Sequence, residues 1–99
     1  MPAVFIDVDP RTLRLPNSRR DGADPVKLQR QIARYGKSIA GMPPPIVHRC
    51  TDGELVLYDG VTRATRAAKL CPGQLITVKV VDNEPYPGSR LFTVQDRLP

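Results

Sequence analysis

A short segment in the middle of the chain has the residue types that a phosphate site needs. It reads Asp59-Gly60-Val61-Thr62-Arg63 and stands between a hydrophobic run and an alanine-rich stretch. Gly60 lets the backbone approach a ligand, and the free amides after it would point outward at the positive end of a helix. Arg63 would reach the same anion with two hydrogen bonds, and Thr62 would add its hydroxyl. The segment therefore predicts a phosphate-binding turn.

The same segment also has an ordinary structural interpretation. Asp59 is a favourable N-cap for a helix, Gly60 suits a tight turn, and Arg63 would then be a solvated side chain. From these residues alone, the phosphate site and the structural alternative both stay open.

The other reactive side chains form no recognisable catalytic motif, so the catalytic residues stay unknown. Cys50 and Cys71 are the two cysteines of the chain. Because they lack the spacing of a redox or metal pair, we expect two buried thiols. The single histidine, His48, lies inside a predicted strand, which favours a structural role over a catalytic one.

No metal ligand is predicted. Two pairs of acids stand beside predicted turns, Asp52 with Glu54 and Asp82 with Glu84. Carboxylate pairs can hold a divalent ion, but pairs that flank turns are usually solvated.

Hydrophobic patterns predict the elements that must position the turn. Asp24 as N-cap, Pro25 at the first helical position and Gly36 as a stop delimit one helix. An Asp-Gly turn between two β-branched runs predicts a hairpin. The expected strands cover residues 3–9, 46–50, 54–58 and 75–81, with a weak last strand at 91–94. This order predicts an α+β fold, a small mixed β-sheet packed by two main helices.

The second helix is expected over residues 61–71, directly after the turn. Its periodicity places one set of side chains on a common face and another set opposite. The first set is Val61, Ala64, Ala68 and Cys71, and the second is Thr62, Arg66 and Lys69.

The composition fits a single domain, 1–99. Of the 99 residues 40% are hydrophobic and 25% charged, and no apolar stretch is long enough for a membrane span. The N-terminal segment lacks the basic region of a secretory signal, so we expect a cytoplasmic protein without a membrane partner. Aromatic residues are few, and Tyr35, Tyr58 and Phe92 are expected in the core.

The formal net charge is +5 and the pI about 9.7. Such a charge favours encounter with a polyanion such as nucleic acid. The positive residues gather early in the chain, at Arg11, Arg14, Arg19, Arg20, Lys27, Arg30, Arg34 and Lys37. A solvated loop and helix face is the alternative interpretation.

The order of the short motifs resembles the ParB/sulfiredoxin-like N-terminal domain family, over roughly residues 4 to 82. The motifs are Leu28 to Tyr35-Gly36, Pro45-Ile46-Val47, Asp52-Gly53-Glu54-Leu55, Asp59-Gly60-Val61-Thr62-Arg63, Ala67-Ala68-Lys69-Leu70 and Ile76-Thr77-Val78. In ParB-type proteins the glycine and arginine turn helps to bind nucleotide phosphates, and some relatives are CTPases, nucleases or kinases.

The resemblance implies a nucleotide or nucleic-acid phosphate site on this chain. Its residues would be Gly60, Val61, Thr62 and Arg63, joined by Arg19 and Arg20 from the early loop, which connects the first expected strand to the first expected helix. The cofactor stays unknown, with a nucleoside triphosphate and magnesium as the candidate, and whether the protein is an enzyme stays open.

Departures from the family narrow these expectations. Sulfiredoxins carry a catalytic cysteine and then a histidine before the arginine, whereas Val61 and Thr62 stand there. We therefore expect no sulfinic acid reduction. ParB proteins usually carry a charged residue where Thr62 stands, which also weakens the case for CTP hydrolysis. Since the chain ends at Pro99 without helix-turn-helix and dimerisation domains, a complete partition protein is not expected.

The leading hypothesis from the sequence is a nucleotide- or nucleic-acid-binding ParB-like module. One alternative is a protein-interaction module, without enzymatic activity, in which the site has degenerated. Another is a metal-dependent nuclease. A protein partner is also compatible with the sequence.

Overall fold

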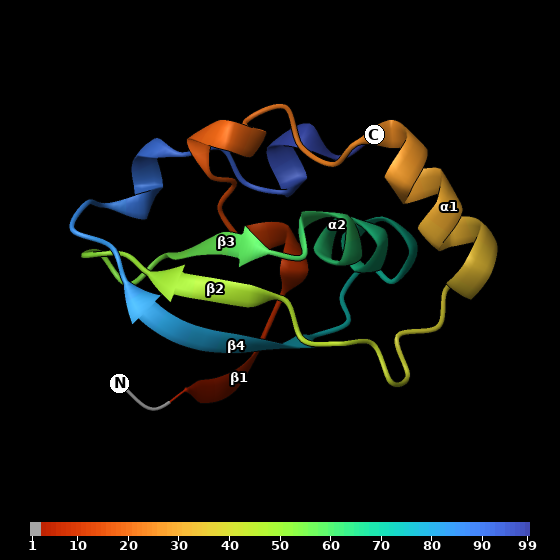
Figure 1. The fold of residues 1–99 in the computed structure, drawn as a ribbon, viewed down its shortest axis with the longest axis horizontal. Coiled ribbons are helices and arrows are strands. Elements are labelled where there is room, and N and C mark those ends of the chain that lie inside the picture. The colour runs from red at the N-terminus through yellow and green to blue at the C-terminus, as the bar shows by residue number, and fades with distance from the viewer. Residues whose placement is uncertain (1–2) are drawn as a thin grey trace.

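One mixed β-sheet forms the lower left part of the molecule in Figure 1, with the two main helices to its right. The computed structural model describes residues 3–99, and residues 1 and 2 of the predicted domain lie outside this range. Within it the sheet has four strands in the order β1-β4-β2-β3. They are β1 (Val4–Val8), β2 (Ile46–Arg49), β3 (Leu55–Asp59) and β4 (Ile76–Asn83).

The strand pairing confirms the predicted hairpin and the mixed sheet. β2 and β3 are antiparallel, β1 is antiparallel to β4, and β2 is parallel to β4. Parallel neighbours need a crossover connection, which usually contains a helix. Here β3 and helix α2 (Val61–Leu70) provide it, so the start of α2 follows directly on the end of β3.

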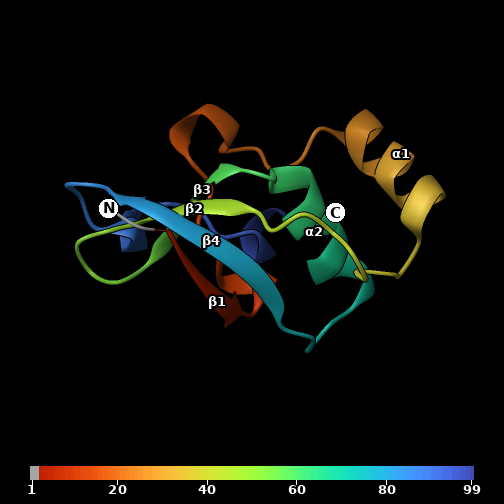
Figure 2. The same ribbon diagram turned by 60° about the horizontal axis from the view of Figure 1, so that its bottom comes forward.

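Helix α1 (Pro25–Tyr35) has the ends that the sequence predicts. The Asp24 carboxylate accepts hydrogen bonds from the amides of Val26 and Lys27, at 2.8 and 3.2 Å. Gly36 ends the helix with a φ of 57°, a conformation that favours glycine. In both ribbon views α2 lies between the sheet and α1 (Figures 1 and 2). The α+β fold with two main helices is thus confirmed.

Small side chains let α2 lie close against the sheet. Ala64, Ala67 and Ala68 are buried, together with Val61 at the first helical position. Aliphatic residues of the strands and of the early loop complete this core, among them Leu13, Leu15, Val47, Leu57, Ile76 and Val78. Burial of this apolar surface is the main stabilising contribution to the position of α2.

The periodicity of α2 places Arg66 opposite the apolar face, where a solvent-exposed side chain is expected. In the structure Arg66 is buried, with 2% of its surface exposed. Its guanidinium donates hydrogen bonds to the carbonyls of Gly36 and Ser38, at 3.0 and 2.6 Å. It also lies 5.2 Å from the ring centre of Tyr35. α2 is covered by the sheet on one side and by α1 with its following connection on another. A single-face pattern cannot reveal the second covered side.

The weak strand predicted at 91–94 is not formed. Thr93 makes one isolated bridge with Arg14, and two short 3-10 helices flank it, at Gly88–Arg90 and Gln95–Arg97. The Asp96 carboxylate accepts a hydrogen bond from the Thr93 amide, and the Thr93 hydroxyl accepts one from the Asp96 amide. The backbone bonds of the bridge are formed, from the Leu15 amide to the Phe92 carbonyl and from the Val94 amide to the Leu13 carbonyl, but the turn at Thr93 and Asp96 ends the pairing there.

The prediction that Tyr35, Tyr58 and Phe92 belong to the core is also wrong. All three are exposed, and Tyr58 is 70% exposed. Aliphatic side chains fill the core without them.

Both cysteines are free thiols. Cys50 is buried as predicted, and burial raises the pKa of its thiol. Cys71 is only partly buried, because α2 ends there; its thiol lies 3.0 Å from the Lys37 carbonyl.

The helices within residues 3–99 are all too short or too polar to cross a membrane.

Candidate phosphate-binding site

The turn from β3 to α2 forms one wall of a pocket of about 410 Å³. Cavities of several hundred Å³ are typical of small-molecule sites. The other walls come from the early loop and from the first half of α1. Residues far apart in the sequence therefore meet around the predicted turn.

Gly60, not Asp59, is the N-cap of α2. Its φ of 98° is left-handed, and no side chain caps the helix. A Cβ atom at this position would lie 2.8 Å from the Arg63 guanidinium and 3.0 Å from Pro45 Cα. The site therefore requires glycine. The ordinary interpretation of Asp59 as an N-cap is excluded.

The start of α2 leaves backbone donors open. The first helical hydrogen bond runs from the Ala64 amide to the Gly60 carbonyl, at 2.9 Å. The amides of the preceding residues point out of the helix end, where the dipole is positive. Without a capping side chain, these amides are suited to bind an anion.

Arg63 has one guanidinium nitrogen without a partner. Its Nε is buried and makes no hydrogen bond within the described residues. Its Nη2 lies 3.9 Å from Asp59 Oδ2, at the outer limit of an ion pair. Buried donors are rarely left unsatisfied, because each costs about 1–3 kcal/mol. An anion at the turn would supply acceptors that the protein does not.

Positive charge dominates the pocket lining. Arg19, Lys27 and Arg30 join Arg63, and Asp59 is the one carboxylate of the lining residues within the described range. No ion pair within residues 3–99 involves Arg19, Lys27 or Arg30. Such cations would raise the local concentration of an anionic ligand and would stabilise it once bound.

The Asp24 carboxylate at the start of α1 interacts with two of these cations. Backbone hydrogen bonds from Lys27 and Val26 lower the pKa of the Asp24 carboxyl, and the charges of Lys27 and Arg19 lower it further. Asp24 is occupied as the N-cap of α1 and does not line the pocket.

Most of the predicted site residues meet in this pocket. Gly60, Val61, Thr62, Arg63 and Arg19 line it. The Val61 side chain is buried, so only its backbone faces a ligand.

Arg20, the other predicted cation, is absent from the lining residues within the described part of the chain. Its backbone carbonyl accepts a hydrogen bond from Arg97 Nε, at 3.0 Å, which ties this loop to the C-terminal segment. The structure thus separates the two neighbouring arginines.

The sequence did not point to six of the lining residues. Three of them carry a charge or an aromatic ring, Lys27, Arg30 and Tyr58, and the others are Pro16, Ser18 and Gln31. Lys27 and Arg30 stand three residues apart, which places them on the same helical face. That spacing was a usable signal, but nothing in the sequence shows that this face looks towards the turn. Tyr58 carries no signal that separates it from a core aromatic.

Tyr58 is held by neighbours on the sheet. Its ring stacks on His48, with centroids 4.7 Å apart and an angle of 19° between the planes. His48 Nδ1 in turn lies 2.8 Å from a Glu84 carboxylate oxygen. These contacts give His48 a supporting role, in keeping with the structural role expected for it.

The acidic residues within the described range do not form a metal centre. No group of three or more His, Cys, Asp or Glu side chains lies together among residues 3–99. Asp52 instead accepts hydrogen bonds from the amides of Gly88 and Ser89, which lower the pKa of its carboxyl to about 2. Asp52 therefore fixes a turn.

The fold and the site together define an α+β domain with a cationic pocket at a strand-turn-helix junction. No model of a known protein family matches the chain, and a search of curated proteins finds no match either. The ParB/sulfiredoxin-like family remains a prediction from the motifs.

Proposed function

We propose that the protein binds a nucleotide or nucleic-acid phosphate at the β3–α2 turn, as a ParB/sulfiredoxin-like domain. The order of elements, strand, helix, hairpin, helix and strand, is the one that this resemblance implies. Two free thiols fit a reducing compartment such as the cytoplasm. The binding site itself is argued from the pocket and does not depend on the family.

The observation that carries the proposal is the environment of Arg63. Its buried Nε has no partner, and it lies one turn into a helix whose N-terminal amides are uncapped. A phosphate at the turn would accept hydrogen bonds from these amides and from the guanidinium, and Thr62 would add its hydroxyl. Arg19, Lys27 and Arg30 surround the remaining charge of the ligand.

The proposed activity is the binding of the phosphate-bearing ligand, and it includes no hydrolysis of that ligand. Asp59 is the one acidic lining residue within the described range, and His48 is engaged by Glu84 outside the pocket lining. Magnesium could enter with the ligand, since it binds phosphate oxygens together with few protein ligands.

The decisive experiment is calorimetric titration with a panel of nucleotides, with and without magnesium. Arg63→Ala removes a charge-assisted hydrogen bond, so binding should weaken by about 1.5–3 kcal/mol, which is about ten- to 150-fold. Arg49→Ala is the matched control, because Arg49 is an exposed arginine on β2 outside the pocket. Equal affinities of the wild type and Arg63→Ala would place the site elsewhere.

A further inference from the structure

The outward face of α1 carries a row of cations that begins in the pocket and leaves it. Lys27, Arg30 and Arg34 are exposed and follow one another at spacings of three and four residues. Such residues share one helical face. Lys27 and Arg30 line the pocket, whereas Arg34 is outside it. At a rise of 1.5 Å per residue, Arg34 lies about 10 Å further along the helix than Lys27.

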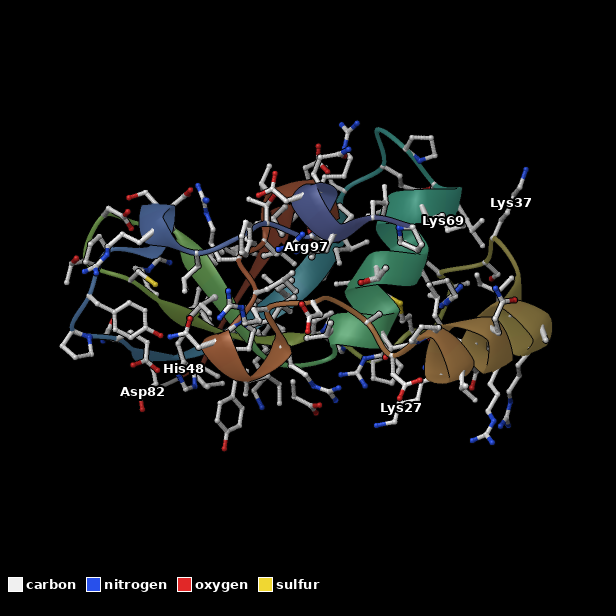
Figure 3. All side chains as sticks on the ribbon, turned by 90° about the horizontal axis from the view of Figure 1, so that it is seen from above. Lys27, Lys37, His48, Lys69, Asp82 and Arg97 are labelled. Atoms are coloured by element: carbon white, nitrogen blue, oxygen red, sulfur yellow. The ribbon has the colours of Figure 1, made fainter. Side chains whose placement is uncertain are left out.

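Lys37, which follows in the sequence, is not part of this row. α1 ends at Tyr35. The view from above shows Lys27 and Lys37 pointing to opposite sides of the molecule (Figure 3). The row therefore consists of Lys27, Arg30 and Arg34.

The helix contributes no negative charge beside the row, and the acids near its start are Asp24, which caps α1, and Asp59 in the pocket lining. Residues 25–37 contain no aspartate or glutamate. None of the ion pairs found within residues 3–99 involves a member of the row, and the Arg34 guanidinium lies 5.4 Å from the Tyr35 ring centre. Like charges at these spacings repel one another, and a bound polyanion relieves the repulsion.

An aromatic ring stands beside the start of the row. Tyr58 lines the same pocket as Lys27 and Arg30, and it is 70% exposed. Since His48 stacks on one face of the ring, the other face is available to a ligand. Stacking on an exposed aromatic ring contributes to the binding of unpaired bases whatever their sequence.

We propose that the ligand is a single-stranded nucleic acid, an inference that rests on the proposed function. One phosphate binds at the β3–α2 turn, its base stacks on Tyr58, and the following phosphates lie along Lys27, Arg30 and Arg34. A mononucleotide held at the turn does not extend to Arg34. In a duplex the bases are already stacked, so Tyr58 gains nothing from them. A cationic path beside an aromatic ring is the usual arrangement for single strands.

The test is fluorescence anisotropy with labelled oligothymidylate and oligouridylate of about 12 nucleotides, within the span of a small binding domain. The DNA and RNA strands distinguish the two sources of the same chemistry. A duplex of the same length and a mononucleotide panel are measured beside them. We expect the single strands to bind more tightly than either.

Two substitutions separate the parts of the proposal. Arg34→Gln should weaken binding of the single strand about three- to fivefold, the scale of an exposed charge contact, and leave mononucleotide binding unchanged. Lys37→Gln, an exposed cation on the other side, should change neither. Tyr58→Ala should weaken single-strand binding about tenfold or more, and Tyr58→Phe, which keeps the ring, should stay within about twofold of the wild type.

The outcomes are distinguishable. If mononucleotides bind through Arg63 but the single strand binds no more tightly, this inference fails and the proposed function stands. Duplex binding as tight as single-strand binding, or indifference to Tyr58→Ala in a variant that melts like the wild type, also overturns it. If no nucleotide and no strand binds, both proposals fail.

Discussion

At the scale of single residues, Gly60 shows how a backbone conformation and a close approach combine at the candidate site. Its left-handed φ and the contacts that a Cβ atom would make with Pro45 and Arg63 both demand glycine. Gly73 has a similar φ of 83°, but a Cβ atom there would meet nothing within 4 Å. A comparison of Gly60 with Gly73 therefore separates the cost of the left-handed backbone, which both share, from the cost of the steric conflict, which only Gly60 has.

Gly60→Ala should therefore destabilise the protein more than Gly73→Ala. We expect about 1 kcal/mol for Gly73→Ala from its conformation alone, and at least about 2 kcal/mol for Gly60→Ala. Urea denaturation of both variants measures the difference. Because the conflict displaces Arg63, Gly60→Ala should also lose ligand affinity, and Gly73→Ala should keep it. Equal losses of stability would mean that the approach of Pro45 is not tight.

The residues of the site also show what a sequence can predict. The Gly60 to Arg63 turn was recognisable because glycine, helix start and arginine fall within four positions. Tyr58 was not, because exposure of an aromatic side chain depends on how much aliphatic volume fills the core. Arg19 and Arg20 were predicted together because the sequence does not distinguish two adjacent arginines in a loop. In the folded chain only Arg19 lines the pocket.

At the scale of elements, Arg66 ties α2 to the connection between α1 and β2. Its guanidinium bonds the carbonyls of Gly36 and Ser38, and the same connection leads to Pro45, which packs against Gly60. A buried arginine on α2 thus holds the segment that packs against the candidate site.

Arg66→Ala should cost about 3 kcal/mol of stability or more. The substitution leaves a cavity in place of a buried side chain and removes the charged donors from the partly buried carbonyls of Gly36 and Ser38, each loss being worth about 1–3 kcal/mol. Lys69→Ala, an exposed residue on the same helix, should change stability by about 0.5 kcal/mol or less. Thermal or urea unfolding checks both. A nearly neutral Arg66→Ala would show that water replaces the guanidinium without loss.

The hairpin turn and the segment after β4 are joined by Asp52, which makes their contact dependent on pH. The amides of Gly88 and Ser89 bind its carboxylate and lower its pKa from 3.8 to about 2. Because the folded pKa is below the unfolded one, the stabilisation is fully present above about pH 4. It is lost as the pH falls towards 2.

Asp52→Asn should accordingly flatten the acid branch of the stability curve. The amide oxygen still accepts a hydrogen bond, but it does not titrate. Urea unfolding at pH 7, 4 and 2.5 should show a smaller drop between the last two values for the variant than for the wild type. Parallel curves would mean that the carboxylate has the same pKa in the folded and unfolded chain.

At the scale of the whole molecule, local signals predicted the elements and their order, but not how the surfaces face one another. Caps at Asp24 and Gly36 and the Asp-Gly hairpin turn are set by neighbouring residues, so the sequence shows them. The burial of Arg66 and the approach of α1 to the turn depend on contacts over tens of residues. The predicted last strand is cut to a single bridge at Thr93 because the chain enters a 3-10 helix at Gln95, and no pattern in the sequence marks that point.

The net charge of +5 becomes a functional property only where it is concentrated. In this fold the early loop, α1 and the start of α2 bring Arg19, Lys27, Arg30 and Arg63 to one pocket, and Arg34 extends the set along α1. Binding of a polyanion there should release counterions in proportion to the phosphates that these cations contact.

The logarithm of the affinity for oligothymidylate should therefore fall linearly with the logarithm of the salt concentration. Each phosphate contact of a single strand contributes a slope of about −0.7, so the phosphate at the turn and those at Lys27, Arg30 and Arg34 together give about −2.8. Arg34→Gln should reduce the magnitude of the slope by about 0.7, whereas Lys37→Gln, with the same change in net charge, should leave it unchanged. Anisotropy titrations at several salt concentrations measure each slope. Equal effects of the two substitutions would mean that net charge, and not the row on α1, governs binding.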